Sequence, residues 1–357
     1  MKAVILVGGE GTRLRPLTRD VPKPMVPIVN KPYMEHQIDY LLRHGFNHII
    51  FALGYKSEAF EQYFGNGDRW NARFSHVVES EPLGTAGAVK NVESLLDDTF
   101  LVFNGDVLSS VDLTGLVRFH RERNALGTLA LTPVEDPSAY GVVVTDPDGR
   151  IRAFIEKPPR EEAPTNAINA GIYVLEPEVV AGMPGARRWM FEHNVFPDLL
   201  RAGRPLYATM TADYWLDIGR PVHYLQANHD VLSGRAGVLL PSAEGGIWRG
   251  EAVRIDPTAR VVGPVWIADG VAIEAGANIL GPTVIGPNCR IGAATVSSSV
   301  VWAGSEVGAQ ARLEACMVGR NCRIGDGCVL ESHSVLGSGE HLAPATHLLP
   351  GTRVPSA

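Results

Sequence analysis

Glycines and basic residues are concentrated near the N-terminus, directly after a short apolar run. The run covers residues 3–7, three glycines fall within residues 8–11, and Arg13 follows. Glycines after a strand let backbone N–H groups approach a phosphate closely, and such amides favour anions. Lys23 stands between two prolines, which stiffen its segment. Because arginine holds two oxygens in a fork and lysine acts as a point charge, this stretch predicts a polyphosphate site.

The glycine loop does not match either of two well-known phosphate-binding patterns. The Walker A pattern requires Gly-Lys-Ser/Thr, which the loop lacks, and the dinucleotide pattern GxGxxG requires a third glycine where Leu14 stands. By itself the loop is also compatible with a plain tight turn, and Arg13 with an ordinary surface ion pair. It therefore predicts phosphate binding without defining the nucleotide.

Two aspartates follow short apolar segments in positions that suit a metal ion. Asp106 comes after the run 100–103, and Asp217 lies in the segment 215–219, which ends in glycine. Mg²⁺ prefers a few carboxylates together with phosphate oxygens and water. An isolated aspartate before a turn can instead cap that turn, so both interpretations stay open at this point. The eleven histidines are scattered, and we assign none of them a ligand or catalytic role.

The first two thirds of the chain alternate apolar runs with segments of helical spacing. The strand-like runs are residues 4–7, 48–52 and 100–103, and the helix-like segments are residues 33–44 and 85–96. Strands that alternate with helices favour βαβ units, so we expect an α/β domain with a mostly parallel sheet. In such sheets ligands bind beyond the carboxyl ends of the strands, where the glycine loop and Asp106 fall.

A different period begins near residue 253, where aliphatic residues recur every six positions and resume after two slips. They are Ile255, Val261, Ile267, Ile273, Ile279, Ile285 and Ile291, followed by Val301, Val307, Leu313, Val318, Ile324 and Leu330. A six-residue period with glycine and turn residues between the aliphatics indicates a parallel β-helix. Three such hexads make one coil, so we expect about five coils.

This change of period sets the expected domain boundaries. They are an α/β domain at 1–232, a linker at 233–250, the β-helix at 251–342 and a loose tail at 343–357. The four cysteines, Cys289, Cys316, Cys322 and Cys328, each stand two positions before a hexad aliphatic. Equivalent positions hold Ala, Val or Thr, which favours core packing over a metal or redox cluster.

Composition excludes several classes of function. The chain has 357 residues, a formal net charge of −7 and 45% hydrophobic residues, typical of a globular protein with two or three domains. Mild acidity argues against a general nucleic-acid or membrane-surface binder. The N-terminal apolar run is too short for a signal peptide, and no stretch approaches the ~18 apolar residues of a membrane span. We expect a soluble cytoplasmic protein with no nucleic-acid or membrane partner.

The glycine loop and its continuation resemble a known family. Residues 8–18 read GGEGTRLRPLT and PKP follows at 22–24, which resembles the signature of the sugar-1-phosphate nucleotidylyltransferases, or nucleoside-diphosphate-sugar pyrophosphorylases. Further motifs follow in that family's order: EPLGTAG at 81–87, NGD at 104–106, YGVV at 140–143, EKP at 156–158, NAG at 169–171 and WLDIG at 215–219. The resemblance covers the N-terminal half and implies a Rossmann-like catalytic sheet there. An appended left-handed hexapeptide β-helix is also common in the family.

The resemblance implies roles for individual residues. Arg13 and Lys23 would stabilise the β,γ-phosphates that leave as pyrophosphate. Lys157 would offset the repulsion between the attacking sugar phosphate and the nucleotide. No general base is required, because a phosphomonoester is largely dianionic at neutral pH. Asp106 and Asp217 would bind Mg²⁺, and Asp106 would also be catalytic.

The same resemblance implies two sets of binding residues. The nucleotide would be bound by Leu6, Gly8, Gly9, Gly11, Thr12, Glu79, Pro82, Gly84 and Thr85. The sugar phosphate would be bound by Gly141, Glu156, Lys157, Asn169 and Gly171. For Gly141, the missing side chain would give the sugar room; a strand bulge is the alternative for Gly141 and Gly171.

The base is expected against residues 78–84. Guanine presents N1–H and N2–H₂ donors that the Glu79 carboxylate can accept as a pair, although Glu79 could equally be a solvated strand end. The strings VPKPMVPIVNKP, FNGDVL and INAGIYVLEP also resemble those of mannose-1-phosphate guanylyltransferases. This implies GTP and mannose 1-phosphate as substrates. Long β-helix enzymes that transfer thymidylyl or uridylyl groups to glucose 1-phosphate are the alternative.

Other classes of function are weighed against this one. A non-catalytic regulatory subunit that binds nucleotide sugar would be expected to lose phosphate or metal positions, which this chain keeps. A second acetyltransferase site in the β-helix would need a catalytic histidine, and His333, His341 and His347 have no supporting residues. Because open β-helix ends invite pairing, we expect a homo-oligomer.

Overall fold

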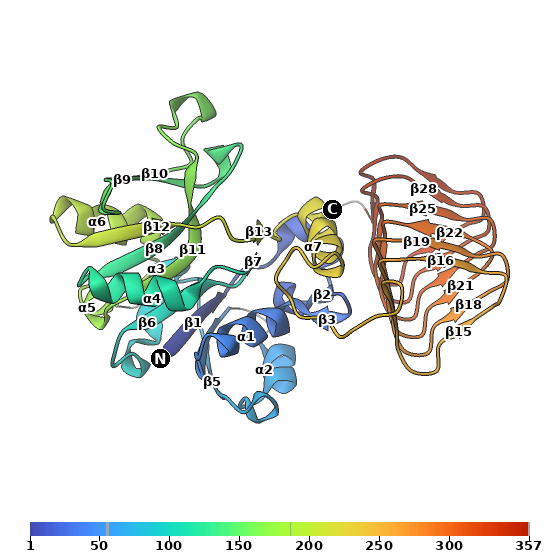
Figure 1. The fold of residues 1–357 in the computed structure, drawn as a ribbon, viewed down its shortest axis with the longest axis horizontal. Coiled ribbons are helices and arrows are strands. Elements are labelled where there is room, and N and C mark those ends of the chain that lie inside the picture. Colours follow the sequence, from blue (N-terminus) through green and yellow to red (C-terminus); the bar gives the residue numbers. More distant parts are fainter. Residues whose placement is uncertain (55–56, 186, 356–357) are drawn as a thin grey trace. The chain divides into compact units, whose positions relative to one another are not determined.

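The computed structural model describes residues 1–54, 57–185 and 187–355 (Figure 1). They form two compact units, the first from Met1–Gly9 with Gln37–Trp215 and the second from Glu10–His36 with Leu216–Ala357. This division differs from the expected boundary at residue 232, because the segment 10–36 belongs to the unit that contains the β-helix. Among the described residues, no helix has the length and apolar character needed to cross a membrane.

A nine-stranded sheet forms the centre of the first unit, with the main path β10-β9-β11-β6-β1-β4-β5 and with β8 between β11 and β12. Its strands are β1 (Lys2–Val7), β4 (His48–Leu53), β5 (Arg73–Val78), β6 (Phe100–Asn104), β8 (Gly127–Pro133), β9 (Gly141–Thr145), β10 (Ile151–Glu156), β11 (Ala167–Leu175) and β12 (Leu206–Met210). The parallel order of β1, β4, β5 and β6 confirms the βαβ prediction. The sheet is mixed, because β11 runs antiparallel to β6, β8 and β9.

The helices of the chain are α1 (Tyr33–Arg43), α2 (Glu58–Phe64), α3 (Gly84–Asn91), α4 (Leu113–Glu122), α5 (Pro177–Ala181), α6 (Phe196–Arg201) and α7 (Pro221–Leu232). The described part of the first 232 residues also contains the short strands β2 (Pro27–Ile28), β3 (Lys31–Pro32), β7 (Val107–Ser109) and β13 (Trp215–Asp217). Helix α1 confirms the predicted helix at 33–44, whereas α3 ends at Asn91 and the rest of the predicted segment 85–96 contains a 3₁₀ turn at Glu93–Leu95. Val89 of α3 is fully buried in one core with Val4, Ile50 and Val102 of the central strands.

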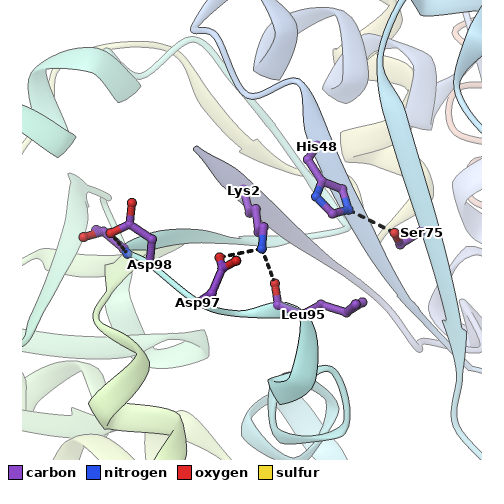
Figure 2. A network of polar contacts seen from close by, with 7 residues as sticks. Lys2, His48, Ser75, Leu95, Asp97 and Asp98 are labelled. Atoms are coloured by element: carbon purple, nitrogen blue, oxygen red, sulfur yellow. Dashed lines mark hydrogen bonds and ion pairs between the residues drawn. The ribbon is translucent and has the colours of Figure 1, made fainter.

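Polar contacts fix the amino ends of the central strands (Figure 2). The Lys2 ammonium donates to the Leu95 carbonyl at 2.7 Å and to Asp97 Oδ1 at 2.5 Å, and the hydrogen bond to Lys2 lowers the pKa of Asp97. His48 Nε2 lies 3.0 Å from Ser75 Oγ and links β4 to β5. These contacts lie at the end of the parallel strands opposite to the glycine loop.

Three parallel sheets of seven, six and six short strands form the β-helix of the second unit. The seven-stranded sheet contains β14 (Ile247–Arg249), β17 (Val265–Ile267), β20 (Thr283–Ile285), β23 (Val300–Val301), β26 (Met317–Val318), β29 (Val335–Leu336) and β32 (Arg353–Val354). The second contains β15 (Arg254–Ile255), β18 (Ala272–Ile273), β21 (Arg290–Ile291), β24 (Glu306–Val307), β27 (Arg323–Ile324) and β30 (His341–Leu342). The third contains β16 (Arg260–Val262), β19 (Asn278–Leu280), β22 (Thr295–Ser297), β25 (Arg312–Glu314), β28 (Val329–Leu330) and β31 (His347–Leu348).

The hexad aliphatics point inward and stack from coil to coil. Ile255 pairs with Ile273 and Ile273 with Ile291, so one coil advances by 18 residues. Ile291 then pairs with Val307, a step of 16 residues, which is where the sequence period slips. These side chains form one buried core, and the predicted β-helix is confirmed.

The β-helix is longer than the sequence predicted. The expected linker 233–250 already contains β14, and the expected tail 343–357 contains β31 and β32. The six-residue period in fact continues through the expected tail, with Leu336, Leu342, Leu348 and Val354 following Leu330 at steps of six. These residues belong to the β-helix core or pack against it, so the predicted end at residue 342 was placed too early.

The four cysteines confirm the packing interpretation. All four are buried, free thiols in the β-helix core. Burial raises the pKa of Cys289 to about 11 and that of Cys316 to about 12. The thiols of Cys289 and Cys316 are therefore protonated at neutral pH, and all four cysteines are packed as small apolar groups.

Outward-facing residues of the seven-stranded sheet are also buried, because the segment 10–36 and α7 cover them within the same unit. Val284, Val300, Met317 and Val335 are at most 1% exposed. The indole N–H of Trp302 donates to the Tyr224 hydroxyl at 2.8 Å, and that hydroxyl donates to the Pro27 carbonyl at 2.6 Å. The β-helix, α7 and the segment around β2 are thus joined by one chain of hydrogen bonds.

Candidate active site

The end of β1 lies beside the turn that carries Asp106. Leu6 pairs with Asn104 in the parallel register of β1 and β6, and the Gly105 amide donates to the Leu6 carbonyl at 3.0 Å. A Cβ on Gly105 would lie 2.2 Å from that oxygen, so the turn requires glycine there. Asp106 is therefore held at the carboxyl ends of two neighbouring strands.

The first two glycines of the loop leave their backbone open. Gly8 and Gly9 are exposed, and a Cβ on either would meet no heavy atom within 4 Å. A Cβ on Gly54, at the end of β4, would lie only 2.9 Å from the Gly8 Cα. The loop is thus supported from one side while its amides remain accessible to an anion.

Glu79 lies in the turn between β5 and α3. Its Oε2 accepts a hydrogen bond from the Leu83 amide at 3.1 Å, and half-burial raises the pKa of its carboxyl group. It is therefore not the freely solvated strand end that the sequence left open. Pro82, in the same turn, is exposed.

The segment that precedes α6 covers the first turn of α3. Gly84 has φ +74°, and a Cβ there would lie 2.7 Å from Met190 Sδ. The amides of Ala86 and Gly87 both donate to the Trp189 carbonyl at 3.0 Å. The backbone amides of the first turn of α3 are therefore covered by the segment around Trp189 and Met190. A nucleotide at this place would contact the surrounding side chains and loops, not these amides.

Sequence reasoning missed Glu192, which lies in this covering segment. Glu192 Oε2 accepts from the Thr85 hydroxyl at 2.9 Å, and Thr85 Oγ1 accepts from the Phe191 amide at 3.0 Å. Burial raises the pKa of Glu192, and the negative charge of Glu156 raises it further. No motif surrounds Glu192, and the polar residues His193 and Asn194 follow it directly, so the sequence offered no clear signal.

Gly141 and Glu156 pair directly across the hairpin of β9 and β10. A Cβ on Gly141 would lie 2.8 Å from Glu156 Oε2 and 2.6 Å from Phe154 Cζ, so glycine leaves the carboxylate its place. Lys157 Nζ lies 3.0 Å from Glu156 Oε1. This hairpin therefore presents an exposed ammonium beside a half-buried carboxylate.

Asn169 and Gly171 lie where the register of β11 with β8 shifts. Asn169 Nδ2 donates to the Tyr173 hydroxyl at 2.7 Å, and Asn169 Oδ1 accepts from the Gly171 amide at 3.0 Å. Gly171 has φ +71°, and a Cβ there would lie 2.4 Å from Asn104 Nδ2. The bulge interpretation of Gly171 is thus correct, and the bulge brings β11 against the residue two positions before Asp106.

The second unit brings Arg13 and Asp217 together. Arg13 Nη1 lies 3.9 Å from Asp217 Oδ2, while Asp217 Oδ1 accepts from the Gly219 amide at 2.7 Å. A Cβ on Gly219 would lie 2.7 Å from Arg13 Nη2, so the guanidinium occupies the space that glycine leaves. Asp217 therefore closes a turn, as the capping interpretation requires, and keeps a second oxygen for a cation.

Lys23 lies behind the same loop. Gly11 has φ +65°, and a Cβ there would lie 3.0 Å from Lys23 Cβ. The Thr18 hydroxyl donates to the Gly11 carbonyl at 2.7 Å. Lys23 is 8% exposed, whereas Thr12 and Arg13 are exposed. The two cations predicted for phosphate thus come from one folded loop.

Asp106 lies in the first unit and Asp217 in the second, and each offers carboxylate oxygens of the kind that a hard cation such as Mg²⁺ takes as ligands. Asp217 retains Oδ2 after its bond to Gly219. In the described part of the chain, no three or more His, Cys, Asp or Glu side chains form a group that could hold a metal.

A glycine loop after the first strand and a carboxylate at a strand end are typical of nucleotide-binding α/β enzymes. The family described as Nucleotidyl transferase matches residues 2–234, and the GMPPB C-terminal domain matches residues 261–355. The chain belongs to the nucleotidyl transferase family.

Relatives with assigned names cover most of the chain. A mannose-1-phosphate guanylyltransferase of Mycobacterium tuberculosis is 39% identical over 88% of this chain and 79% of its own length. A UTP–glucose-1-phosphate uridylyltransferase of Synechocystis sp. is also 39% identical, over 88% of this chain and 86% of its own length. The solved structure of HddC from Yersinia pseudotuberculosis aligns with a TM-score of 0.57 at 30% identity, covering 64% of this chain and 99% of that chain. The predicted enzyme class is thus confirmed.

Proposed function

We propose that this enzyme transfers a guanylyl group from GTP to mannose 1-phosphate, giving GDP-mannose and pyrophosphate. The observation that carries the choice of base is the half-buried Glu79, whose Oε2 bonds the Leu83 amide while the carboxylate keeps further acceptor positions. A carboxylate held in this way suits the paired N–H donors of guanine. The name of the Mycobacterium tuberculosis relative supports the same base and sugar. An HddC structure described as a complex with GMP-PN supports a guanine nucleotide.

The cations of the second unit are assigned to the phosphates that leave. Exposed Arg13 would hold two oxygens of the β,γ-phosphates, and Lys23 would add a point charge from the same loop. Catalysis of this kind depends mainly on positioning and charge neutralisation. The open amides of Gly8 and Gly9 would bind further phosphate oxygens.

The attacking group is assigned to the hairpin of β9 and β10. An oxygen of the mannose 1-phosphate forms a bond to the α-phosphorus of GTP, while the bond from that phosphorus to the bridging oxygen of pyrophosphate breaks. Lys157 would offset the repulsion between the two anions, with Glu156 on the sugar hydroxyls. Asn169, Gly171 and Gly141 would complete the sugar pocket.

The proposed metal ligands are Asp106 and Asp217. When bound, Mg²⁺ would neutralise negative charge on the nucleotide phosphates. The proposal rests on the donor chemistry of these carboxylates and on the motifs that surround them.

One specific observation favours a second candidate function. The Synechocystis relative, named for UTP and glucose 1-phosphate, and the Mycobacterium tuberculosis guanylyltransferase are both 39% identical to this chain, each over 88% of this chain. A uridylyl or thymidylyl transferase acting on glucose 1-phosphate would use the same phosphate loop. The difference would lie in the base and sugar pockets alone.

The deciding experiment is pyrophosphate release from GTP, UTP, dTTP and ATP, each with mannose 1-phosphate and with glucose 1-phosphate. We expect the highest kcat/KM for GTP with mannose 1-phosphate, and no turnover after removal of Mg²⁺ with EDTA. High turnover of UTP or dTTP with glucose 1-phosphate, and little with GTP and mannose 1-phosphate, would establish the second candidate instead. No turnover with any pair would favour a non-catalytic regulatory subunit.

A further inference from the structure

The last coil of the β-helix contacts the loop that carries Arg13, and both belong to the second unit. Arg353, in β32, donates from Nη1 to the Arg15 carbonyl at 3.1 Å and to the Arg13 carbonyl at 3.4 Å. The two hydrogens of one guanidinium nitrogen can serve two carbonyl oxygens at once. The contact therefore joins two backbone groups on either side of Leu14, in and just after the single helical turn Thr12–Leu14.

A close apolar contact lies beside this pair of hydrogen bonds. A Cβ on Gly337, in the coil that precedes β32, would lie 3.1 Å from Pro16 Cβ and 3.2 Å from Pro355 Cδ. The Gly337 amide donates to the Val354 carbonyl at 2.6 Å. The loop thus packs closely against the last two coils through Pro16.

The identity of Arg353 is unusual for its place in the sheet. Its outward position aligns through the register with Val335, Met317, Val300 and Val284, all of them apolar. An aliphatic residue would continue this row and would cover the same surface. Arginine adds donors at the level of the row where the carbonyls of Arg13 and Arg15 face the sheet.

We infer that Arg353 is a positioning residue for the phosphate site: by fixing the backbone of residues 13–15, it directs the Arg13 side chain. The inference rests on the proposed function, in which Arg13 binds the pyrophosphate moiety. If the inference holds, the β-helix supports the phosphate site of its own chain, which is a role separate from oligomer assembly. The 3.9 Å approach of Arg13 to Asp217 is the geometry that this support would maintain.

The test is the reverse reaction, in which GDP-mannose (or UDP-glucose, if that pair is the active one) reacts with pyrophosphate. Arg353→Met keeps the aliphatic stem and removes the donors. We expect the KM for pyrophosphate to rise about five- to tenfold, as for the loss of one or two hydrogen bonds, with the KM for the nucleotide sugar unchanged. Arg323→Met, an exposed arginine on another sheet of the β-helix, is the matched control and should behave as wild type.

A double-mutant cycle with Arg13→Ala separates the inference from the proposed function. If Arg353 acts through Arg13, the Arg353→Met substitution should have little further effect on the pyrophosphate KM in the Arg13→Ala background. Equal effects in both backgrounds, or an unchanged KM in Arg353→Met, would overturn the inference. An unchanged KM in Arg13→Ala alone would instead overturn the assignment of Arg13.

Stability is followed in the same proteins by thermal unfolding. If Arg353→Met does not fold, Arg353→Lys is used, because its single ammonium lacks the guanidinium fork and reaches less far. A two- to threefold rise in the pyrophosphate KM is then expected, about the loss of one weak hydrogen bond. A folded Arg353→Lys protein with the wild-type KM would refute the inference.

Discussion

Arg13 and Asp217 form an ion pair with 3.9 Å between Nη1 and Oδ2, although they are about 200 residues apart in the sequence. Arg13 is 56% exposed in its side chain and Asp217 only 17%, so the carboxylate is the fixed partner and the guanidinium the movable one. The pair joins a residue proposed for phosphate with one proposed for metal. When Mg²⁺ and a nucleotide bind, we therefore expect the pair to separate, with Asp217 turning to the metal and Arg13 to the phosphates.

Asp217→Asn tests this assignment, because the amide oxygen can still accept from the Gly219 amide and preserve the turn. Loss of the charge should lower kcat/KM by at least about a hundredfold and raise the Mg²⁺ concentration needed for half-maximal rate. Activity is measured by pyrophosphate release over a Mg²⁺ titration. Asp112→Asn is the control, because Asp112 accepts from the Gly115 amide at the start of α4 and has no proposed ligand role. An unchanged Mg²⁺ dependence in Asp217→Asn would remove it from the metal site.

Glu79→Gln tests the recognition of the base. Glutamine can still accept from the Leu83 amide, but it replaces a paired acceptor by one donor and one acceptor. We expect kcat/KM for GTP to fall about 10- to 100-fold, with a smaller loss or a gain for UTP, measured over the four nucleotides. Glu81→Gln, an exposed neighbour in the same turn, should leave the preference unchanged. If Glu79→Gln keeps the wild-type preference for GTP, its role is confined to the turn.

Local patterns predicted the fold better than the arrangement of the site. The aliphatic period from Ile255 onward predicts the β-helix, because the inward positions of the coils recur every six residues and do not depend on contacts with the rest of the chain. The same period continues to Val354 in β32, next to Arg353, although the sequence prediction ended the β-helix at residue 342. The period could not show that Arg13 lies beside Asp217, since such proximity depends on tertiary packing. Glu192 was missed for the same reason: its partner Thr85 is distant in sequence.

His120→Gln tests a buried histidine in α4. His120 is 1% exposed, with Nδ1 2.9 Å from Thr128 Oγ1 and Nε2 2.9 Å from Glu176 Oε1. Burial lowers its pKa although Glu176 acts in the opposite direction. The neutral ring donates from Nε2 to Glu176 and accepts from Thr128.

The lowered pKa fixes the sign of the pH dependence. Below about pH 6.5 the unfolded chain binds a proton that folded His120 does not, so stability falls as the pH decreases toward the lower folded pKa. The limiting slope is about 1.4 kcal/mol per pH unit. Urea midpoints between pH 5 and 8 should change less steeply in His120→Gln than in wild type. His341→Gln, an exposed histidine, is the control. Identical slopes in wild type and His120→Gln would contradict the assignment.

The cysteines of the β-helix should be inert in the folded protein. Their burial and the raised pKa values of Cys289, Cys316 and Cys322 keep the thiolate population low. A thiol reagent such as Ellman's should label none of them within minutes under native conditions and all of them in denaturant. Rapid labelling of any one thiol in the native protein would show that the coils open locally.

Glu192→Gln should stabilise the protein while impairing the enzyme. Glutamine can keep the acceptor for the Thr85 hydroxyl but carries no charge. Because burial raises the pKa of Glu192, its ionisation costs folding free energy as the pH rises above the unfolded value of about 4.5. At pH 7 the variant should therefore melt roughly 2 °C or more above wild type, and the difference should disappear near pH 4. Glu178→Gln, an exposed glutamate, is the control and should show no such difference at pH 7.

A buried acid retained at such a cost is expected to serve the site, so turnover should fall together with the gain in stability. Equal stability of wild type and Glu192→Gln at pH 7 would show that the carboxylate is accommodated without penalty.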